Sequence, residues 1–232
     1  DQRDRFSFRQ IRMTVEEVEL IDRMCVSIDK ITPIMQINAE VQHADRVRPA
    51  VNITAIRPAW HEIEQRFVTL GRPIMQSDED EGLQVCLVND KAIEELALAS
   101  DPSGTRIRVE GRMFLVVGVV ETKTVSPVFG GGESRTEVFI PFKTGQSMRS
   151  EPRIYATAST IRSDMFEDAK EEVRAVMRRE RGLNPDDPDT FGVEAIQQVI
   201  QTVQRVTGAM TGILIGVVGV ALVVGGVGIM NI

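Results

Sequence analysis

The chain has 232 residues, of which 42% are apolar and 26% are charged, a balance typical of a globular protein with one sizeable core or two smaller ones. A formal net charge of −7 disfavours binding to a phosphate backbone, and an aromatic content of 5% leaves few side chains on which single-stranded bases could stack. We therefore expect no nucleic-acid partner. The arginines are spread among acidic residues and indicate no binding patch. The charged start, residues 1–5, has no signal-peptide pattern, and we expect the chain to be part of a longer one.

The first segment predicts a strand, a helix and a hairpin. Residues 6–13 resemble a strand, and residues 14–17 match the capping box that begins a helix. An apolar helical stripe follows, formed by Val18, Ile21, Cys25 and Ile28. Residues 35–41 alternate between apolar and polar side chains, a turn is expected at residues 43–46, and residues 47–56 predict the returning strand.

The middle segment, residues 67–148, predicts a compact and mainly β part of the chain. A helix is expected at residues 90–99 and a turn at residues 101–104. Residues 126–134 form a Gly-rich loop, which we interpret as a flexible hairpin tip and not a phosphate loop, because no GK[ST] follows it. The expected strands lie at residues 85–88, 106–109, 113–120 and 137–141.

The segment after residue 149 repeats the first pattern. A strand is predicted at residues 153–160 and a helix start at residues 164–167, and Gly182 is placed to end that helix. Its apolar stripe is formed by Phe166, Ala169, Val173 and Val176. A Pro/Asp-rich loop at residues 184–189 leads to a short strand near residues 190–193. Two β-α-β units therefore predict one α+β sandwich made from both ends of the chain.

The chain ends in an apolar run. Residues 206–232 contain no charged residue, and about 20 apolar residues suffice to cross a bilayer as a helix. An amphipathic stripe leads into this run without a helix breaker, so that a continuous helix from residue 193 would be about 60 Å long. The residues of this expected stalk are Val193, Ile196, Ile200 and Val203.

Small residues mark one face of the expected membrane helix. Gly208, Gly212 and Gly216 recur at every fourth position, as in helices that pack closely in a bundle. The twenty residues before the run contain Asp186, Asp187, Asp189 and Glu194, and Arg205 is their one basic residue. The positive-inside rule then favours an outside location for the soluble part.

We find no pattern for a catalytic, cofactor-binding or metal-binding site, and expect no enzyme. Cys25 and Cys86 lack metal-ligand spacing, and whether they form a bridge stays open. His43 and His61 are expected at the surface, and the acidic residues 78–81 favour a solvated loop over a cation site. Trp60 and Tyr155 are expected to be packing residues.

Several motifs resemble the MacB-like and FtsX-like ABC-transporter permeases. The last eight residues, GGVGIMNI, are similar to the start of the second membrane helix of that family. The other matching motifs are Leu70-Gly71-Arg72 with Asp78, the turn from Asp101 to Ile107, the strand from Phe114 to Val119, and Val138-Phe139-Ile140-Pro141.

The resemblance implies an α+β periplasmic domain. It has two β-α-β units in a split Porter-like subdomain, an inserted and mainly-β Sabre-like subdomain, and a long stalk and transmembrane helix. The implied boundaries are residues 1–66 and 149–192 for the Porter-like parts, 67–148 for the Sabre-like insert, 193–206 for the stalk, and 207–232 for the start of the transmembrane helix.

The resemblance also implies a function and partners. The domain would transmit ATP-driven conformational change across the bacterial inner membrane and export a substrate from the periplasm. ATP would bind a cytoplasmic ABC ATPase, fused or separate, and the partners would be a second permease subunit and a periplasmic adaptor protein. Alternatives are a lipoprotein-releasing permease, a non-transporting FtsX-like regulator of a periplasmic partner, and an enzyme or binding domain with a single membrane anchor.

Overall fold

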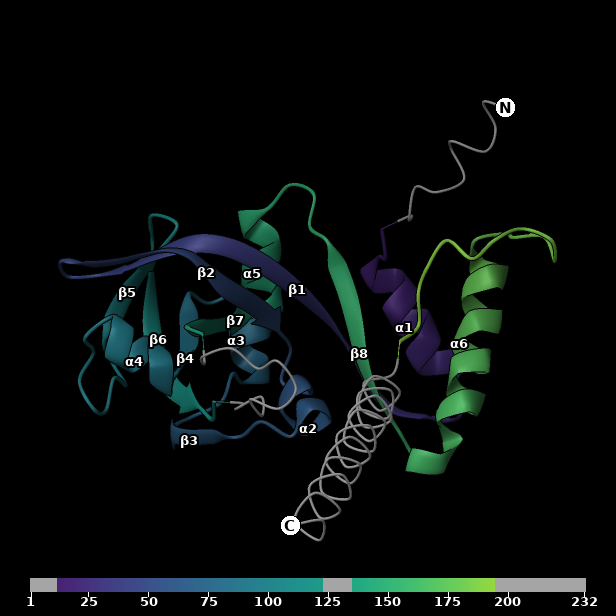
Figure 1. Cartoon of the computed structure of the whole chain (residues 1–232), viewed down its shortest axis with the longest axis horizontal. Helices are drawn as coiled ribbons and strands as arrows, with labels where there is room; N and C mark the ends of the chain where they lie inside the picture. Colours follow the sequence, from purple (N-terminus) through teal and green to yellow (C-terminus); the bar gives the residue numbers. More distant parts are fainter. Residues whose placement is uncertain (1–11, 123–134, 195–232) are drawn as a thin grey trace, which may run out of the picture. The chain divides into compact units, whose positions relative to one another are not determined.

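The computed structural model of the chain describes residues 12–122 and 135–194 and has a mixed α+β fold (Figure 1). The first half contains α1 (Val15–Met24), β1 (Ile28–His43), β2 (Arg46–Ile56), α2 (Trp60–Glu64), β3 (Val68–Gly71), α3 (Gln76–Glu81), β4 (Val85–Asn89) and α4 (Asp90–Glu95). The second half contains β5 (Arg106–Val109), β6 (Arg112–Val120), β7 (Glu137–Pro141), α5 (Phe142–Met148), β8 (Ile154–Thr160), the 3₁₀-helix η2 (Ser163–Met165) and α6 (Phe166–Glu180). The α+β prediction is confirmed.

Six strands form a closed barrel. They pair in the order β2-β7-β4-β6-β5-β1, and β1 pairs again with β2, which closes the ring. The β2–β7 and β4–β6 pairs are parallel, and closure removes the free edges of an open sheet. The predicted insert, residues 67–148, thus shares one barrel with β1 and β2. The boundaries expected at residues 66 and 148 stay predictions.

Alternation along β1 places the barrel core. Met35, Ile37, Ala39 and Val41 are all buried, as the sequence predicts, and β1 pairs antiparallel with β2 across a turn before Arg46. The predicted hairpin is therefore confirmed. The other strands contribute buried side chains to the same cluster, which include Val51, Ile53, Ala55, Cys86, Val88, Ile107, Val109, Phe114, Val116, Val138 and Ile140.

A second group of elements lies outside the ring, and we call it the helical layer: α1, α6, β8 and residues 28–35 of β1. β8 pairs antiparallel with that half of β1, and α1 contacts α6. Thr14 and Glu17 exchange two hydrogen bonds of 2.9 and 3.2 Å at the start of α1, which confirms the predicted capping box. The layer has its own cluster, formed by Met13, Ile21, Cys25, Ile28, Ile31, Val173, Val176, Met177 and Phe191.

Three predicted elements are wrong. Ile28 begins β1 and does not continue the stripe of α1, because the helix ends at Met24. The helix expected to reach residue 99 ends at Glu95, and Ala97 has a left-handed φ of 50°. Residues 190–193 form no strand. There the carbonyl of Thr190 accepts a hydrogen bond of 3.0 Å from Arg181.

Other predictions concern residues at the limits of the described part. Met13 forms an isolated bridge with Ile154, whereas the rest of the strand expected at residues 6–13 lies outside the described residues apart from Arg12. The Gly-rich loop at residues 126–134 lies outside them as well. Gly182 ends α6 as expected, with a φ of 60° and its N–H donating to the carbonyl of Arg179.

Candidate functional site

Most residues predicted for the stalk and its packing face lie outside the described part of the chain. These are Ile196, Ile200, Val203, Gly208, Gly212 and Gly216. Val193 is described, half-buried and not helical, so no helix begins there. Within residues 12–122 and 135–194, no helix is long and apolar enough to span a membrane. The membrane helix at residues 207–232 stays a prediction.

Gly71, Arg72 and Asp78, which carry part of the family resemblance, connect β3 to α3. Gly71 has a φ of 75°, and a Cβ there would lie 2.8 Å from the Cα of Gly118 in β6, so the position requires glycine. The Arg72 guanidinium donates to both carboxylate oxygens of Asp78, at 2.5 and 3.0 Å. The N–H of Met75 donates to the same carboxylate at 2.8 Å.

The environment of Asp78 shows why the acidic stretch is not a solvated loop. Asp78 is 1% exposed and Glu79 is also buried, and both belong to α3, so that expectation is wrong. Burial alone would raise the pKa of Asp78, but the hydrogen bonds from Arg72 and from the N–H of Met75 together lower it below its ordinary value. The same ion pair raises the pKa of Arg72. Asp78 therefore acts as a fixed anion that holds β3 and α3 together.

A second buried charge lies where α2 meets the barrel. Arg66 is 5% exposed and donates to the carboxylate of Glu137 at 2.6 and 3.3 Å and to the carbonyl of Glu121 at 2.8 and 3.1 Å. Its guanidinium also lies 5.6 Å from the ring centroid of Trp60 and 5.0 Å from that of Phe139. Paired and stacked in this way, the guanidinium binds α2 to β7.

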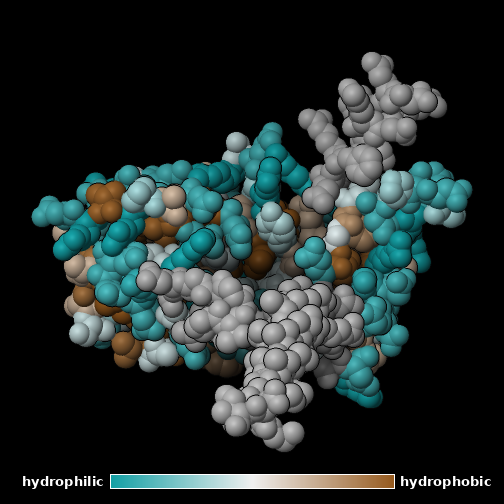
Figure 2. Space-filling model, in the orientation of Figure 1, coloured by the Kyte–Doolittle hydropathy of each residue, from teal (hydrophilic) through white to brown (hydrophobic). Residues whose placement is uncertain are grey.

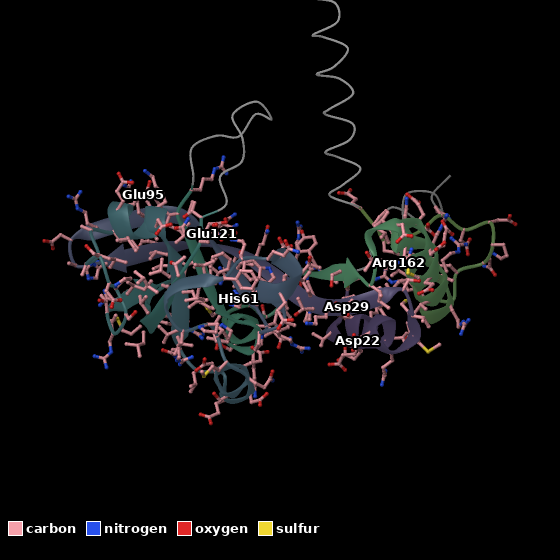
Figure 3. The ribbon with its side chains drawn as sticks, turned by 90° about the horizontal axis from the view of Figure 1, so that it is seen from below. Asp22, Asp29, His61, Glu95, Glu121 and Arg162 are labelled. Atoms are coloured by element: carbon pink, nitrogen blue, oxygen red, sulfur yellow. The ribbon has the colours of Figure 1, made fainter. Side chains whose placement is uncertain are left out.

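His61 is buried beside this guanidinium (labelled in Figure 3), with 6% exposure, so its expected surface position is wrong. Its Nδ1 lies 2.8 Å from the carbonyl oxygen of Arg66, and its Nε2 has no hydrogen-bond partner among the described residues. Burial lowers the pKa of His61; its hydrogen bond to the Arg66 carbonyl opposes this, and the charge of Arg66 lowers the pKa further. A neutral ring with its proton on Nδ1 fits this arrangement.

Glu79 and Arg57 connect α3 to the first turn of α5. The Glu79 carboxylate accepts the N–H of Lys143 at 3.1 Å and lies 3.6 Å from Nε of Arg57. The Arg57 guanidinium in turn lies 5.4 Å from the ring centroid of Phe142. Burial raises the pKa of Glu79, and the N–H of Lys143 and the charge of Arg57 oppose that rise. An acidic group at the start of a helix stabilises it.

The cysteines are separate free thiols. Cys25 lies in the helical layer and Cys86 in the barrel core, and no bridge joins them. Burial, with a contribution from Glu172, raises the pKa of Cys25 to about 11, and burial raises that of Cys86 as well. Neither thiol is a ready nucleophile at neutral pH. In the described ranges, no group of three potential ligands is placed to hold a metal ion.

The buried charged groups therefore join structural elements to one another. Arg72, which follows β3, donates to Asp78 at 2.5 Å, and the N–H of Lys143 in α5 donates to Glu79 at 3.1 Å. Arg66 donates to Glu137 of β7 at 2.6 Å. On the face shown in Figure 2, hydrophobic residues are scattered among hydrophilic ones. Sequence reasoning missed Arg66, because a single arginine has no periodic signal, and it placed Glu79 in a solvated loop because its neighbours are acidic. It correctly assigned Trp60 to packing, but Tyr155 is 51% exposed, so that assignment is wrong.

Comparison with known proteins shows which family the chain matches. Residues 2–176 match the MacB-like periplasmic core domain family. The macrolide export ATP-binding/permease protein MacB of Syntrophobacter fumaroxidans is 22% identical over 275 residues, covering 95% of this chain and 38% of that protein. The chain thus spans well under half the length of that relative.

Solved structures show the same fold. The periplasmic region of MacB from Actinobacillus actinomycetemcomitans superposes with a TM-score of 0.63 at 17% identity, covering 88% of each chain. The extracellular domain of the transporter YknZ from Gram-positive bacteria gives a TM-score of 0.62 at 14% identity, covering 75% of this chain and 86% of that one. At these identities the likeness concerns the fold alone.

Proposed function

The chain belongs to the family of MacB-like periplasmic core domains of ABC-transporter permeases, and from this premise we propose that it transmits ATP-driven movement from the membrane to a substrate outside it. The match over residues 2–176 carries the proposal. The uncharged run at residues 206–232 supports it, because a membrane helix directly after the domain would couple the two. The domain would lie in the periplasm, attached to the bacterial inner membrane.

The partners follow from the same proposal. The name of the Syntrophobacter relative combines ATP binding with a permease, so we propose that a fused or separate cytoplasmic ABC ATPase drives this chain. A second permease subunit would complete a dimer, and a periplasmic adaptor protein would receive the substrate. That relative is named for macrolide export; for this chain we propose efflux of a substrate already in the periplasm.

We also propose that the chain itself catalyses no reaction and binds no cofactor, with ATP held by the ATPase. Arg66, Arg72, Asp78 and Glu79 take part in contacts between elements. This supports a mechanical role, since such contacts would stiffen the domain. A rigid domain passes on a displacement that a soft one would absorb.

The proposal is tested in the complete permease with its ATPase, reconstituted in lipid. A spin label at Arg106→Cys in each of two subunits reports the distance between the two outside domains. We expect this distance to change between the ATP-bound and ADP-bound states, and an ATPase variant that binds but does not hydrolyse ATP should hold the first distance. An identical distance in both nucleotide states would overturn the proposal.

A further inference from the structure

β1 belongs to both parts of the domain. Residues 28–35 pair with β8 in the helical layer, and residues 35–43 pair with β2 in the barrel. Met35 is in register with both Ala55 of β2 and Ile154 of β8. Figure 3 places His61, Glu95 and Glu121 over the barrel and Asp22, Asp29 and Arg162 over the helical layer. Any change in the angle between the two parts must therefore bend β1 near Met35.

The sequence of β1 weakens the strand at that point. Pro33 has no N–H and so supplies no ladder donor in its register with Ala156. Thr32 and Pro33 are both buried, which breaks the alternation that β1 keeps from Met35 onward. Apolar contacts stay close to this point, since Val15 and Ile154 pack against the barrel core. Strand residues 33–35 thus have the features of a pivot.

Away from the pivot, residues 57–64 reach from the barrel to the helical layer, and we call them the strap. Its barrel side is buried: Trp60 packs on Phe139 with ring centroids 4.9 Å apart, and His61 contacts the carbonyl of Arg66. Arg57 lies against Phe142 and Glu79. This side is held by stacking and by buried hydrogen bonds.

The other side of the strap is polar and partly exposed. Glu62 pairs with Lys30 of β1, with side chains 61% and 43% exposed. Arg57 lies 4.0 Å from Glu19 of α1, and Glu64 accepts a hydrogen bond of 3.1 Å from Thr157 of β8. Each of these contacts joins the strap to a different element of the helical layer. Exposed ion pairs contribute about 0–1 kcal/mol each and weaken with salt.

The contacts between the strap and the helical layer lie far from the pivot. Lys30 lies five residues from Met35, which is about 17 Å along an extended strand. A contact at that distance resists rotation about the pivot more effectively than one beside it. Because the barrel side is the stronger attachment, the contacts with the helical layer open first.

We propose that residues 57–64 are a strap that sets the angle between the barrel and the helical layer, and that β1 bends between Pro33 and Met35 when the polar contacts of the strap open. The device works within one chain and does not depend on the transport function proposed above. Its state is set by ionic strength and by load on α1 and β8.

The test uses the 232-residue chain in detergent, with spin labels at Arg106→Cys in β5 and Ala175→Cys in α6, both exposed. The buried native thiols stay unlabelled, which the parent chain verifies. Neutralising the strap with Glu19→Gln and Glu62→Gln is expected to broaden the distribution of label distances. High salt should do the same to the parent chain. Adding Pro33→Val, which restores a ladder donor, should narrow the broadened distribution.

A matched control neutralises two carboxylates that form ion pairs with residues two or three positions away, with Glu94→Gln in α4 and Asp164→Asn in η2. Its distance distribution should equal that of the parent. Exchanging the charges with Lys30→Glu and Glu62→Lys should keep the distribution narrow. An unchanged distribution of label distances in the neutralised strap variant, or equal broadening in the control, would overturn the proposal that residues 57–64 set the angle between the two parts. A failure of Pro33→Val to narrow the distribution of label distances would overturn the proposal that β1 bends between Pro33 and Met35.

Discussion

Arg181, which follows α6, and Glu17, in the first turn of α1, form a two-point ion pair between residues 164 positions apart in the chain, with nitrogen–oxygen distances of 2.7 and 3.0 Å. Their side chains are 4% and 10% exposed. The Arg181 guanidinium also lies 5.7 Å from the ring centroid of Phe191. The pair therefore joins the first and last described helices in a nearly dry environment.

Removing one partner of this pair should be costly. Arg181→Met leaves the Glu17 carboxylate buried without its cation, and we expect the free energy of unfolding to fall by about 3 kcal/mol. Urea denaturation followed by circular dichroism measures the loss. Arg162→Met, which removes an exposed ion pair with Asp164, is the control and should change stability little. Equal effects of the two substitutions would contradict the prediction.

Alanine substitutions at Gly71 and Gly111 allow the cost of backbone strain to be measured apart from the cost of steric crowding. Both have positive φ values, 75° and 80°, but a Cβ at Gly111 meets no atom within 4 Å, whereas one at Gly71 meets Gly118 and the carbonyl of Val117. We expect Gly111→Ala to cost about 1 kcal/mol and Gly71→Ala to cost roughly 1–3 kcal/mol more from overpacking. Thermal unfolding of the two variants side by side gives the difference. Similar melting temperatures would mean that β3 moves away from β6 at little cost.

His61 makes stability depend on pH. Its pKa in the folded chain lies below the ordinary value of 6.5, so the unfolded chain binds a proton that the folded chain resists. The contribution of His61 to the free energy of unfolding should therefore be greatest above pH 6.5 and decrease as the pH drops below that value. In His61→Phe, which keeps an aromatic ring beside Trp60, the fall between pH 7.5 and pH 5.5 should be smaller. Parallel pH dependences in the two proteins would exclude His61 as the cause.

Gly212 tests the expected packing face of the membrane helix. A bulky side chain there would prevent close approach of a neighbouring helix, so Gly212→Leu in the complete permease should preserve ATP hydrolysis and reduce transport. Rates of hydrolysis and of substrate release into proteoliposomes measure the two activities. Ile213→Leu is the matched control and should leave both rates unchanged. An unchanged transport rate in Gly212→Leu would contradict the prediction that transport requires close packing at this face of the helix.

Local pattern predicts some elements of this fold well. The alternation of residues 35–41 gives both the strand and its inward face, because β1 is covered on one side there by the barrel core. Thr14 and Glu17 mark the start of α1 through a short-range exchange of hydrogen bonds. Such signals lie within a few residues of one another and are visible in the sequence.

Pairings between distant segments are not visible in that way. Ile53 of β2 and Val138 of β7 are in parallel register within the barrel, yet the periodicity of a strand does not indicate which strand it pairs with. His61 and Glu79 are buried by elements that lie elsewhere in the sequence, so their polar neighbours mislead a local interpretation. The candidate stalk residues depend on a periodicity that the described part of the chain does not test.

The double role of β1 has a consequence for synthesis. Its barrel half finds a partner in β2 a few residues later, but Ile28 pairs with Thr160, which leaves the ribosome more than a hundred residues afterwards. During translation the first half of β1 must therefore remain an unpaired edge, and such edges promote aggregation. We expect nascent chains truncated before β8 to recruit chaperones, and that requirement to end once Thr160 has emerged.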